Sequence, residues 1–201
     1  CEDGSMFGEE YTLVAVADYV LSKTPGNTVS NLSSTRALRD ITKKYNGTYE
    51  AAAVGEVNVV EKMKATNAII GGEGNGGVIY PELHYGRDAL LGIALFLTHL
   101  AERKVSVKQL RNNYPNYFIS KNKIQLTPNI DVENILTVLE NKYKHEEITT
   151  IDGLKIDFED GWVHLRKSNT EPIIRIYAES KDKIKAKFFA DKMIAEIKVL
   201  I

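Results

Sequence analysis

The polar stretch at residues 166–172, Arg-Lys-Ser-Asn-Thr-Glu-Pro, has side chains that could bind a phosphate group. Runs rich in β-branched and aromatic residues lie on both sides, so the stretch is expected to connect two strands. Ser168, Asn169 and Thr170 tolerate turns in which successive backbone N–H groups point the same way. Arg166 adds a guanidinium beside them, and this combination suits a phosphate. The alternative is an ordinary polar hairpin loop without a ligand.

A glycine-rich stretch at residues 71–77, Gly-Gly-Glu-Gly-Asn-Gly-Gly, is the second place where chemistry is indicated. Its five glycines let the backbone approach a ligand closely. Glu73 supplies a hydrogen-bond acceptor and Asn75 a donor and an acceptor, a combination that suits neighbouring sugar hydroxyls. The stretch has neither the lysine of a P-loop nor the glycine spacing of a dinucleotide fingerprint, so a nucleotide is not indicated. The alternative is a flexible turn with a solvated glutamate.

The composition predicts a soluble, cytoplasmic protein. The chain has 201 residues, of which 43% are hydrophobic, so it can bury a substantial core. Its net charge of −1 gives no general attraction for nucleic acid. The apolar runs are too short and too interrupted for a membrane span, and no secretory signal is present. A single cysteine, Cys1, fits a reducing compartment.

Strand and helix patterns divide the chain into two expected domains, residues 1–116 and 117–201. In the first, helix patterns alternate with short strand patterns, and the last strand leads into the glycine-rich stretch. This alternation predicts an α/β domain with a mixed or mostly parallel sheet covered by helices on both faces. In such folds ligands bind beyond the carboxyl ends of the strands.

The second domain is predicted to be a smaller α+β domain. A helix capped near Asp131, short strands separated by Asp-Gly and Glu-Asp-Gly turns, and a final helix at residues 181–201 indicate a four-stranded antiparallel sheet with two helices. Residues 114–127 are assigned to the link, with a hinge at residues 117–128 that permits domain closure. The apolar residues expected on the buried side of the final helix are Ile184, Phe188, Met193, Ile194 and Ile197.

Both polar stretches resemble, in type and in order, binding loops of the α-D-phosphohexomutase superfamily, which includes phosphoglucomutase, phosphomannomutase and phosphoglucosamine mutase. Residues 166–172 and the Ile-Arg-Ile-Tyr strand after them resemble the phosphate-binding loop. Gly-Glu-x-Asn-Gly-Gly resembles the sugar-binding loop, usually Gly-Glu-x-Ser-Gly-His. The glycine at Gly77, where a histidine is common, and the sequence at residues 80–88 indicate an archaeal-like phosphoglucosamine or phosphomannomutase subgroup.

The resemblance implies roles for individual residues. Glu73 and Asn75 would hold sugar hydroxyls. Glu56 falls where family members place a side chain near the substrate, but we favour a second role, that of a helix N-terminal acid. The residues implied to hold the non-reacting phosphate are Arg166, Ser168, Asn169 and Thr170, with Arg175 as a helper. None of them is a catalytic residue.

The resemblance also implies that this chain is the last two of four domains. The family's phosphoserine loop and its Asp-Gly-Asp-x-Asp-Arg loop, which holds Mg²⁺, do not occur in the sequence. The intact enzyme would interconvert hexose 1-phosphate and hexose 6-phosphate through a phosphoserine, with Mg²⁺ as cofactor. The expected partners are a hexose phosphate or bisphosphate and the N-terminal domains of the same protein, and this chain alone is expected to be inactive. The alternative is a stand-alone sugar-phosphate or anion-binding module without catalysis.

Overall fold

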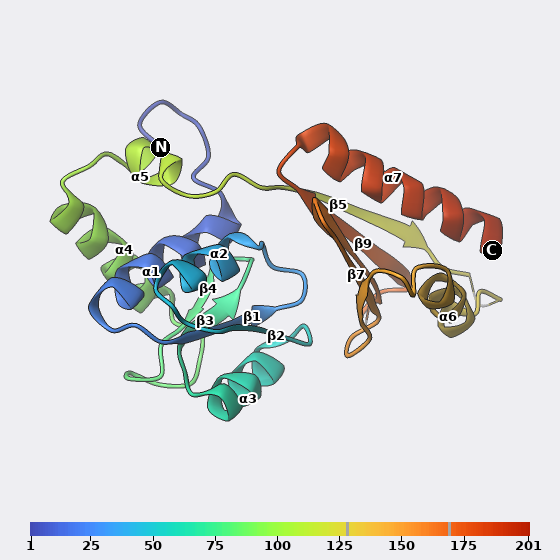
Figure 1. Cartoon of the computed structure of the whole chain (residues 1–201), viewed down its shortest axis with the longest axis horizontal. Coiled ribbons are helices and arrows are strands. Elements are labelled where there is room, and N and C mark those ends of the chain that lie inside the picture. Colours follow the sequence, from blue (N-terminus) through green and yellow to red (C-terminus); the bar gives the residue numbers. More distant parts are fainter. Residues whose placement is uncertain (128, 169) are drawn as a thin grey trace. The chain divides into compact units, whose positions relative to one another are not determined.

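A computed structural model describes residues 1–127, 129–168 and 170–201 of the chain. These residues form two compact units, Cys1–Asn116 (unit 1) and Tyr117–Ile201 (unit 2) (Figure 1). No helix within the described residues is both long enough and apolar enough to cross a membrane.

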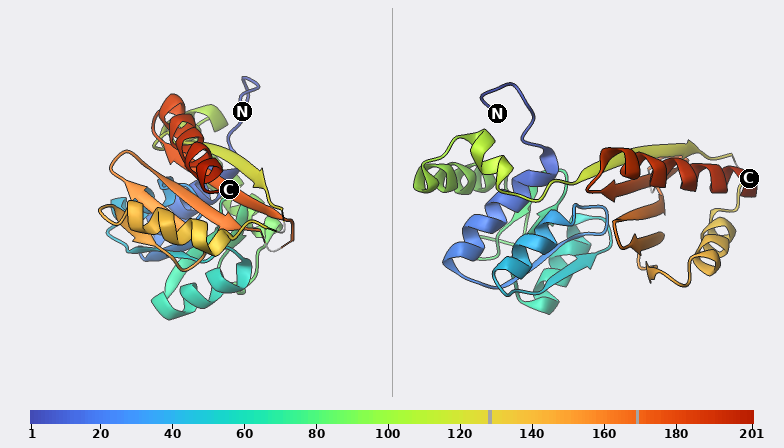
Figure 2. Two further views of the ribbon diagram at one scale, coloured as in Figure 1. Left: turned by 90° about the vertical axis from the view of Figure 1, so that its right-hand side faces the viewer. Right: turned by 45° about the horizontal axis from the view of Figure 1, so that its top comes forward.

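Unit 1 is an α/β unit built on a mixed sheet. Its elements, in chain order, are α1 (Glu9–Lys23), β1 (Asn27–Asn31), α2 (Ala37–Lys44), β2 (Tyr49–Ala52), α3 (Glu56–Thr66), β3 (Ala68–Glu73), β4 (Gly77–Ile79), α4 (Ala89–Arg103) and α5 (Val107–Asn112). The strand order is β2-β1-β3-β4, with β1 parallel to β2 and β3 and with β4 antiparallel to β3. Helix α3 covers one face and α1 and α2 the other, which confirms the predicted layers (Figures 1 and 2).

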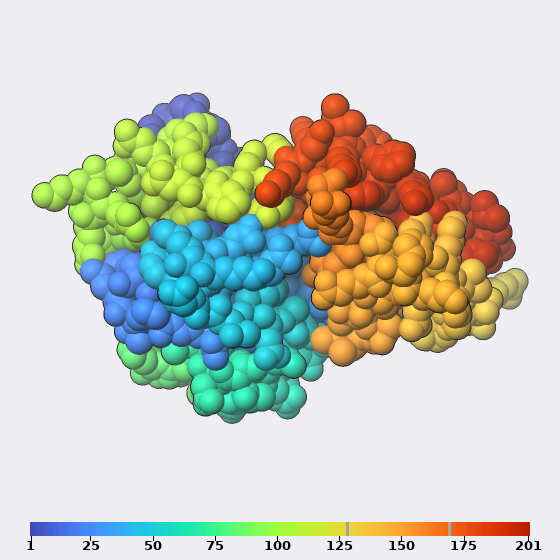
Figure 3. Space-filling model, in the orientation of Figure 1, coloured from blue at the N-terminus to red at the C-terminus, as the bar shows by residue number. Residues whose placement is uncertain are grey.

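The core of unit 1 beneath α3 fixes β1 and β3 side by side. Val59 and Met63 of α3 pack against Val29 of β1 and Ala68 of β3, and all four are buried. In the space-filling view α3 (teal) forms part of the outer surface of this unit (Figure 3). Because β1 and β3 are parallel neighbours, the residues that follow them meet at one edge of the sheet.

The glycine-rich stretch is a strand hairpin for most of its length, and not the long loop that we predicted. Residues 71–73 belong to β3, and Gly77 opens β4 and pairs with Glu73. Only residues 74–76 form the turn between the strands. Glycine has no side chain to pack on a pleated sheet and is depleted from strands. A glycine-rich sequence therefore predicts a loop, although here it forms a strand pair.

Unit 2 is an antiparallel sheet with two helices on one face. Its elements are β5 (Phe118–Gln125), α6 (Val132–Lys142), β6 (Glu147–Thr149), β7 (Leu154–Phe158), β8 (Gly161–Lys167), β9 (Ile173–Ser180) and α7 (Lys183–Leu200). The strand order is β5-β9-β8-β7-β6 (Figures 1 and 2). A single core joins side chains from α6, α7 and one face of the sheet, including Ile135, Leu139, Leu165, Ile176 and Met193.

The sheet of unit 2 has five strands, whereas the sequence predicted four. The additional strand is β5, which pairs with β9 along all eight of its residues. Because these backbone groups are hydrogen-bonded in the sheet, most of the hinge predicted at residues 117–128 is wrong; Pro128 lies outside the described residues. Lysines alternating with less polar residues gave the strand the mixed polarity of a link.

Helix α7 packs through a face that agrees with the prediction at Met193, Ile194 and Ile197 but differs from it in the N-terminal half of the helix. Its buried residues are Ala186, Ala190, Met193 and Ile197, whereas Ile184 is 80% exposed and Phe188 60% exposed. The buried positions follow a spacing of three and four residues, which places them on one helix face. Two of the buried residues are alanines, which contribute little to a hydrophobic pattern, so the sequence did not indicate that they lie on the buried face.

The packing of α7 predicts unequal effects from one substitution at two positions. Ile197→Ala should lower the free energy of unfolding by about 2–5 kcal/mol, because it leaves a cavity in the core. Ile184→Ala is the matched control and should change this free energy by less than about 0.5 kcal/mol. Urea unfolding of both variants tests this, and equal losses would contradict the packing of α7.

Candidate functional site

Glu73 lies at the C-terminal end of β3 and is nearly buried, with 5% of its surface exposed. Its Oε1 accepts a hydrogen bond of 2.9 Å from Nδ2 of Asn31, at the end of β1. Its Oε2 accepts one of 3.1 Å from Nη1 of Arg87. A buried carboxylate needs such partners, and here they also fix its orientation. The sequence predicted Glu73 as a site residue, but not these two partners.

Arg87 joins Glu73 to Glu56, the first residue of α3. The Nε of Arg87 donates to Oε2 of Glu56 at 2.8 Å, and the backbone N–H of Arg87 donates to Oε1 at 3.1 Å. These two hydrogen bonds lower the pKa of the Glu56 carboxyl. Glu56 therefore begins a helix, as favoured, and it also contacts a partner of the candidate site.

The turn beyond β3 is held from two sides. Asn75 is exposed, and its Oδ1 accepts from the backbone N–H of Gly77 at 3.1 Å, which leaves its amide nitrogen available. The backbone N–H of Gly74 donates to Oγ of Ser34, which follows β1. Ser34 in turn donates to Oδ1 of Asn31. Asn75 is thus presented on an ordered turn.

In unit 2, register places three cationic side chains in one row across the sheet. Arg166 of β8 lies opposite Arg175 of β9, and Arg175 lies opposite Lys123 of β5. We call Lys123, Arg175 and Arg166 the cationic row. Like charges directly opposite each other destabilise a strand pair unless an anion compensates them.

One member of the cationic row is partly neutralised. Nη2 of Arg175 pairs with Oε2 of Glu171 at 2.6 Å. Arg166 makes no ion pair or side-chain hydrogen bond with the described residues, so its guanidinium can receive an anion. Lys123 was missed from sequence because β5 was assigned to a link.

The polar loop that follows β8 is partly ordered by its own hydroxyls. Ser168 is 7% exposed, and its Oγ lies 3.4 Å from both the hydroxyl and the backbone nitrogen of Thr170. The backbone N–H of Ser168 donates to the carbonyl of Ile173, so the hydroxyl is the donor that Ser168 can offer to an anion. Asn169, which is also predicted to bind the phosphate, lies outside the described residues.

His164 lies two residues before Arg166 on the same strand face and is 2% exposed. Its Nε2 lies 2.7 Å from the backbone carbonyl of Asp152, which can only accept, so Nε2 carries the proton. Burial lowers the pKa of His164 to about 4, with a smaller contribution from the charges of Lys155 and Arg166. The imidazole beside the cationic row is therefore neutral near pH 7.

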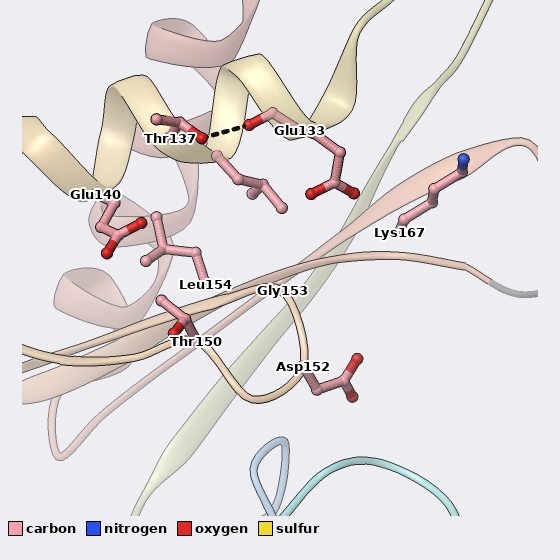
Figure 4. Close-up of a pocket in the computed structure, with 9 residues that line it drawn as sticks. Glu133, Thr137, Glu140, Thr150, Asp152, Gly153, Leu154 and Lys167 are labelled. Carbon is pink, nitrogen blue, oxygen red and sulfur yellow. Dashed lines mark hydrogen bonds between the residues drawn. The ribbon is translucent and has the colours of Figure 1, made fainter.

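A pocket of about 330 Å³ opens elsewhere in unit 2 (Figure 4). It lies between α6 and the turn before β7, with Thr137 and Glu140 on one side and Thr150 on the other (Figure 4). Glu133, Glu140 and Asp152 among its lining residues disfavour an anion. Of the described residues in the polar stretch at 166–172, Lys167 alone lines the pocket. Across residues 1–127, 129–168 and 170–201, no three His, Cys, Asp or Glu side chains gather to hold a metal ion.

The succession of an α/β unit and an antiparallel α+β unit is that of the phosphohexomutases. A phosphoglucomutase/phosphomannomutase family protein from Burkholderia thailandensis has a similar solved structure, with a TM-score of 0.82, 26% identity, and coverage of 99% of this chain and 43% of that chain. Aspergillus fumigatus N-acetylphosphoglucosamine mutase, solved with GlcNAc-6P and magnesium, shares the fold at a TM-score of 0.64 and 13% identity, over 94% of this chain and 46% of that chain.

The chain belongs to the phosphoglucomutase/phosphomannomutase family. The model of the family's alpha/beta/alpha domain III matches residues 8–117, and that of its C-terminal domain matches residues 123–196. A phosphoglucosamine/phosphogalactosamine mutase of Sulfurisphaera tokodaii is 37% identical over 175 residues, which are 86% of this chain and 38% of that protein. The chain thus spans about two fifths of the length of the relatives that it matches.

The burial of His164 predicts a specific acid dependence of stability. Its pKa in the folded state, about 4, lies below the ordinary value of 6.5, so the unfolded chain takes up the proton first as pH falls. The neutral His164 therefore contributes its full share to the free energy of unfolding above pH 6.5. This free energy falls progressively towards pH 4, by on the order of 3 kcal/mol.

Urea unfolding across this pH range, with and without His164→Gln, isolates the contribution. The substitution should flatten the fall in unfolding free energy, whereas His145→Gln, at a histidine whose side chain is 68% exposed, should not. An unchanged pH dependence in His164→Gln would mean that another group causes it.

Proposed function

We propose that this chain is the substrate-recognition part of a phosphohexomutase, an isomerase that interconverts hexose 1-phosphate and hexose 6-phosphate. The observation that carries the proposal is the cationic row, in which Arg166 faces Arg175 across the strand pair and has no anionic partner among the described residues. A phosphate dianion between them would relieve the repulsion and accept two-pronged hydrogen bonds from the Arg166 guanidinium.

The phosphate held there would be the one that does not react. Ser168 and Thr170 would add hydroxyl hydrogen bonds from the loop, and Asn169 is proposed with them from its position in the sequence. Arg175, shared with Glu171, would supply charge more than geometry. Binding energy from a remote phosphate can be used to orient the reacting end of the substrate.

Glu73 and Asn75 would hold the sugar hydroxyls. The Glu73 carboxylate is fixed by Asn31 and Arg87 and still has lone pairs to accept hydrogen bonds from a ligand. Asn75 offers the amide nitrogen that its turn leaves unused. Glu56 would act through Arg87, to which it is bonded.

The phosphoryl transfer itself would use groups from outside this chain. We expect a phosphoserine and a Mg²⁺ ion that neutralises charge on the transferring group, both contributed by N-terminal domains of the same cytoplasmic protein. No residue described here is assigned to the metal. The contribution of this chain is to bind and orient the hexose phosphate.

Replacing the guanidinium of Arg166 should weaken phosphate binding although the charge is retained. In the complete protein, Arg166→Lys should lower the binding free energy for a hexose 6-phosphate by about 1–3 kcal/mol, because lysine cannot form the two-pronged contact. Calorimetric titration measures the loss, and Arg103→Lys, at an arginine in α4, serves as a control. Equal affinities for the wild type and Arg166→Lys would assign Arg166 a structural role.

The purified 201-residue chain should show no mutase turnover. We expect none with glucose, mannose or glucosamine phosphates in the presence of Mg²⁺ and a bisphosphate activator. Turnover that is abolished by Ser168→Ala would contradict the proposal and make Ser168 a nucleophile. An intact gene product that binds hexose phosphates but never isomerises them would favour a non-catalytic binding module.

A further inference from the structure

Arg87 is the charged residue of the unit 1 site whose role the proposed function leaves open. Its side chain is 44% exposed, although its Nε donates to Glu56 and its Nη1 to Glu73, and its backbone N–H donates to Glu56 as well. A guanidinium has five N–H groups, and only one on Nε and one on Nη1 are used within the described residues. Three N–H groups therefore remain for a ligand.

Gly77 gives Arg87 the space to lie against the glycine turn. A Cβ atom on Gly77 would be 2.6 Å from Cδ and 3.3 Å from Cγ of Arg87, closer than side-chain atoms normally approach. The aliphatic part of Arg87 thus lies where any larger residue at position 77 would have its side chain. Gly77 is also the backbone donor to Asn75, so the guanidinium is held beside the turn that presents Asn75.

The result is a donor and an acceptor fixed next to each other. Nη1 of Arg87 is 3.1 Å from Oε2 of Glu73, a separation on the scale of two neighbouring hydroxyl oxygens of a hexose. One hydroxyl could donate to the Glu73 carboxylate while its neighbour accepts from the free N–H groups of Arg87. Glu56 prevents the guanidinium from folding onto Glu73 alone, because it binds both Nε and the backbone N–H of Arg87.

We propose that Arg87 is a sugar-binding residue that, together with Glu73, reads two adjacent hydroxyls of the hexose, and that Gly77 is required to seat it. This inference rests on the proposed function, because it assumes that the ligand of the site is a hexose phosphate. It assigns discrimination between sugars to a residue pair, Gly77 at the start of strand β4 and Arg87 after its end.

The test combines protein variants with sugars that each lack one hydroxyl. Glucose 6-phosphate and its single deoxy analogues are titrated into the complete protein and into Arg87→Ala. With the parent sugar, Arg87→Ala should weaken binding by roughly ten- to a hundredfold. With the one analogue that lacks the contacted hydroxyl, the same substitution should change affinity by less than about twofold. Glu73→Gln should likewise weaken binding of the parent sugar, but it should leave the affinity for the analogue that lacks the adjacent hydroxyl nearly unchanged.

Two further variants keep the result interpretable. Gly77→Ala retains the guanidinium but displaces it, and should lose affinity for the same sugars as Arg87→Ala, even if Arg87→Ala folds poorly. Arg103→Ala removes a comparably exposed arginine, 47% exposed, and should leave affinity unchanged. A penalty from Arg87→Ala that is the same for every analogue would mean that Arg87 only positions Glu73, and would overturn the inference.

The failure of this inference can be told apart from failure of the proposed function. If the wild type binds hexose phosphates and Arg166→Lys weakens that binding, while Arg87→Ala has no effect, only the inference about Arg87 is wrong. If the wild type binds none of the sugar phosphates, both are wrong.

Discussion

A carboxylate removed from water must be paired, and the site of unit 1 is built around that requirement at Glu73. The pairing needs β1 beside β3, because Asn31 ends the first of these strands and Glu73 the second. It also needs the chain to turn back after β4, because only then does Arg87 lie beside Gly77 at the start of that strand and reach Glu73. The parallel neighbours and the one antiparallel strand are thus both necessary to stabilise a single buried charge.

In unit 2 the candidate site gathers charges of one sign and leaves most of them unpaired within the part of the chain that the structure describes. The strand register sets Lys123, Arg175 and Arg166 in adjacent positions, and within the described residues Glu171 is their only ion-pair partner. At the unit 1 site the charges of Glu73, Arg87 and Glu56 are paired with one another and offer mixed donors and acceptors, whereas the cationic row of unit 2 keeps an excess of positive charge. Under the proposed function these two electrostatic characters correspond to the two halves of a sugar phosphate, the polyol and the dianion.

The sequence predicted the helices and turns whose geometry depends on residues close together in the chain. Helix periodicity, the Asp131 cap and the Asp-Gly turn identified their elements, because capping and turn geometry are decided within a few residues. What depended on pairing between distant strands was missed: the lysines that alternate along β5 suggested a link, and its role as a strand follows from its pairing with β9. The partners of Glu73 were missed for the same reason, since Asn31 and Arg87 are brought to it by sheet order. The buried face of α7 was predicted only in its C-terminal half, because in the N-terminal half it consists of alanines, which pack closely but contribute little to a hydrophobic pattern.

Because β5 lies at the edge of its sheet, its lysines have a role in protecting that edge, and Lys123 also belongs to the cationic row. An edge strand presents unpaired backbone groups that can recruit another chain, and charged side chains, lysine above all, prevent such growth of the sheet. Lys121 and Lys123 stand on this edge, and Lys123 belongs to the cationic row. Selection for solubility and selection for anion affinity therefore act on the same side chain. A substitution at Lys123 that altered affinity for an anion would at the same time change the tendency of the protein to aggregate.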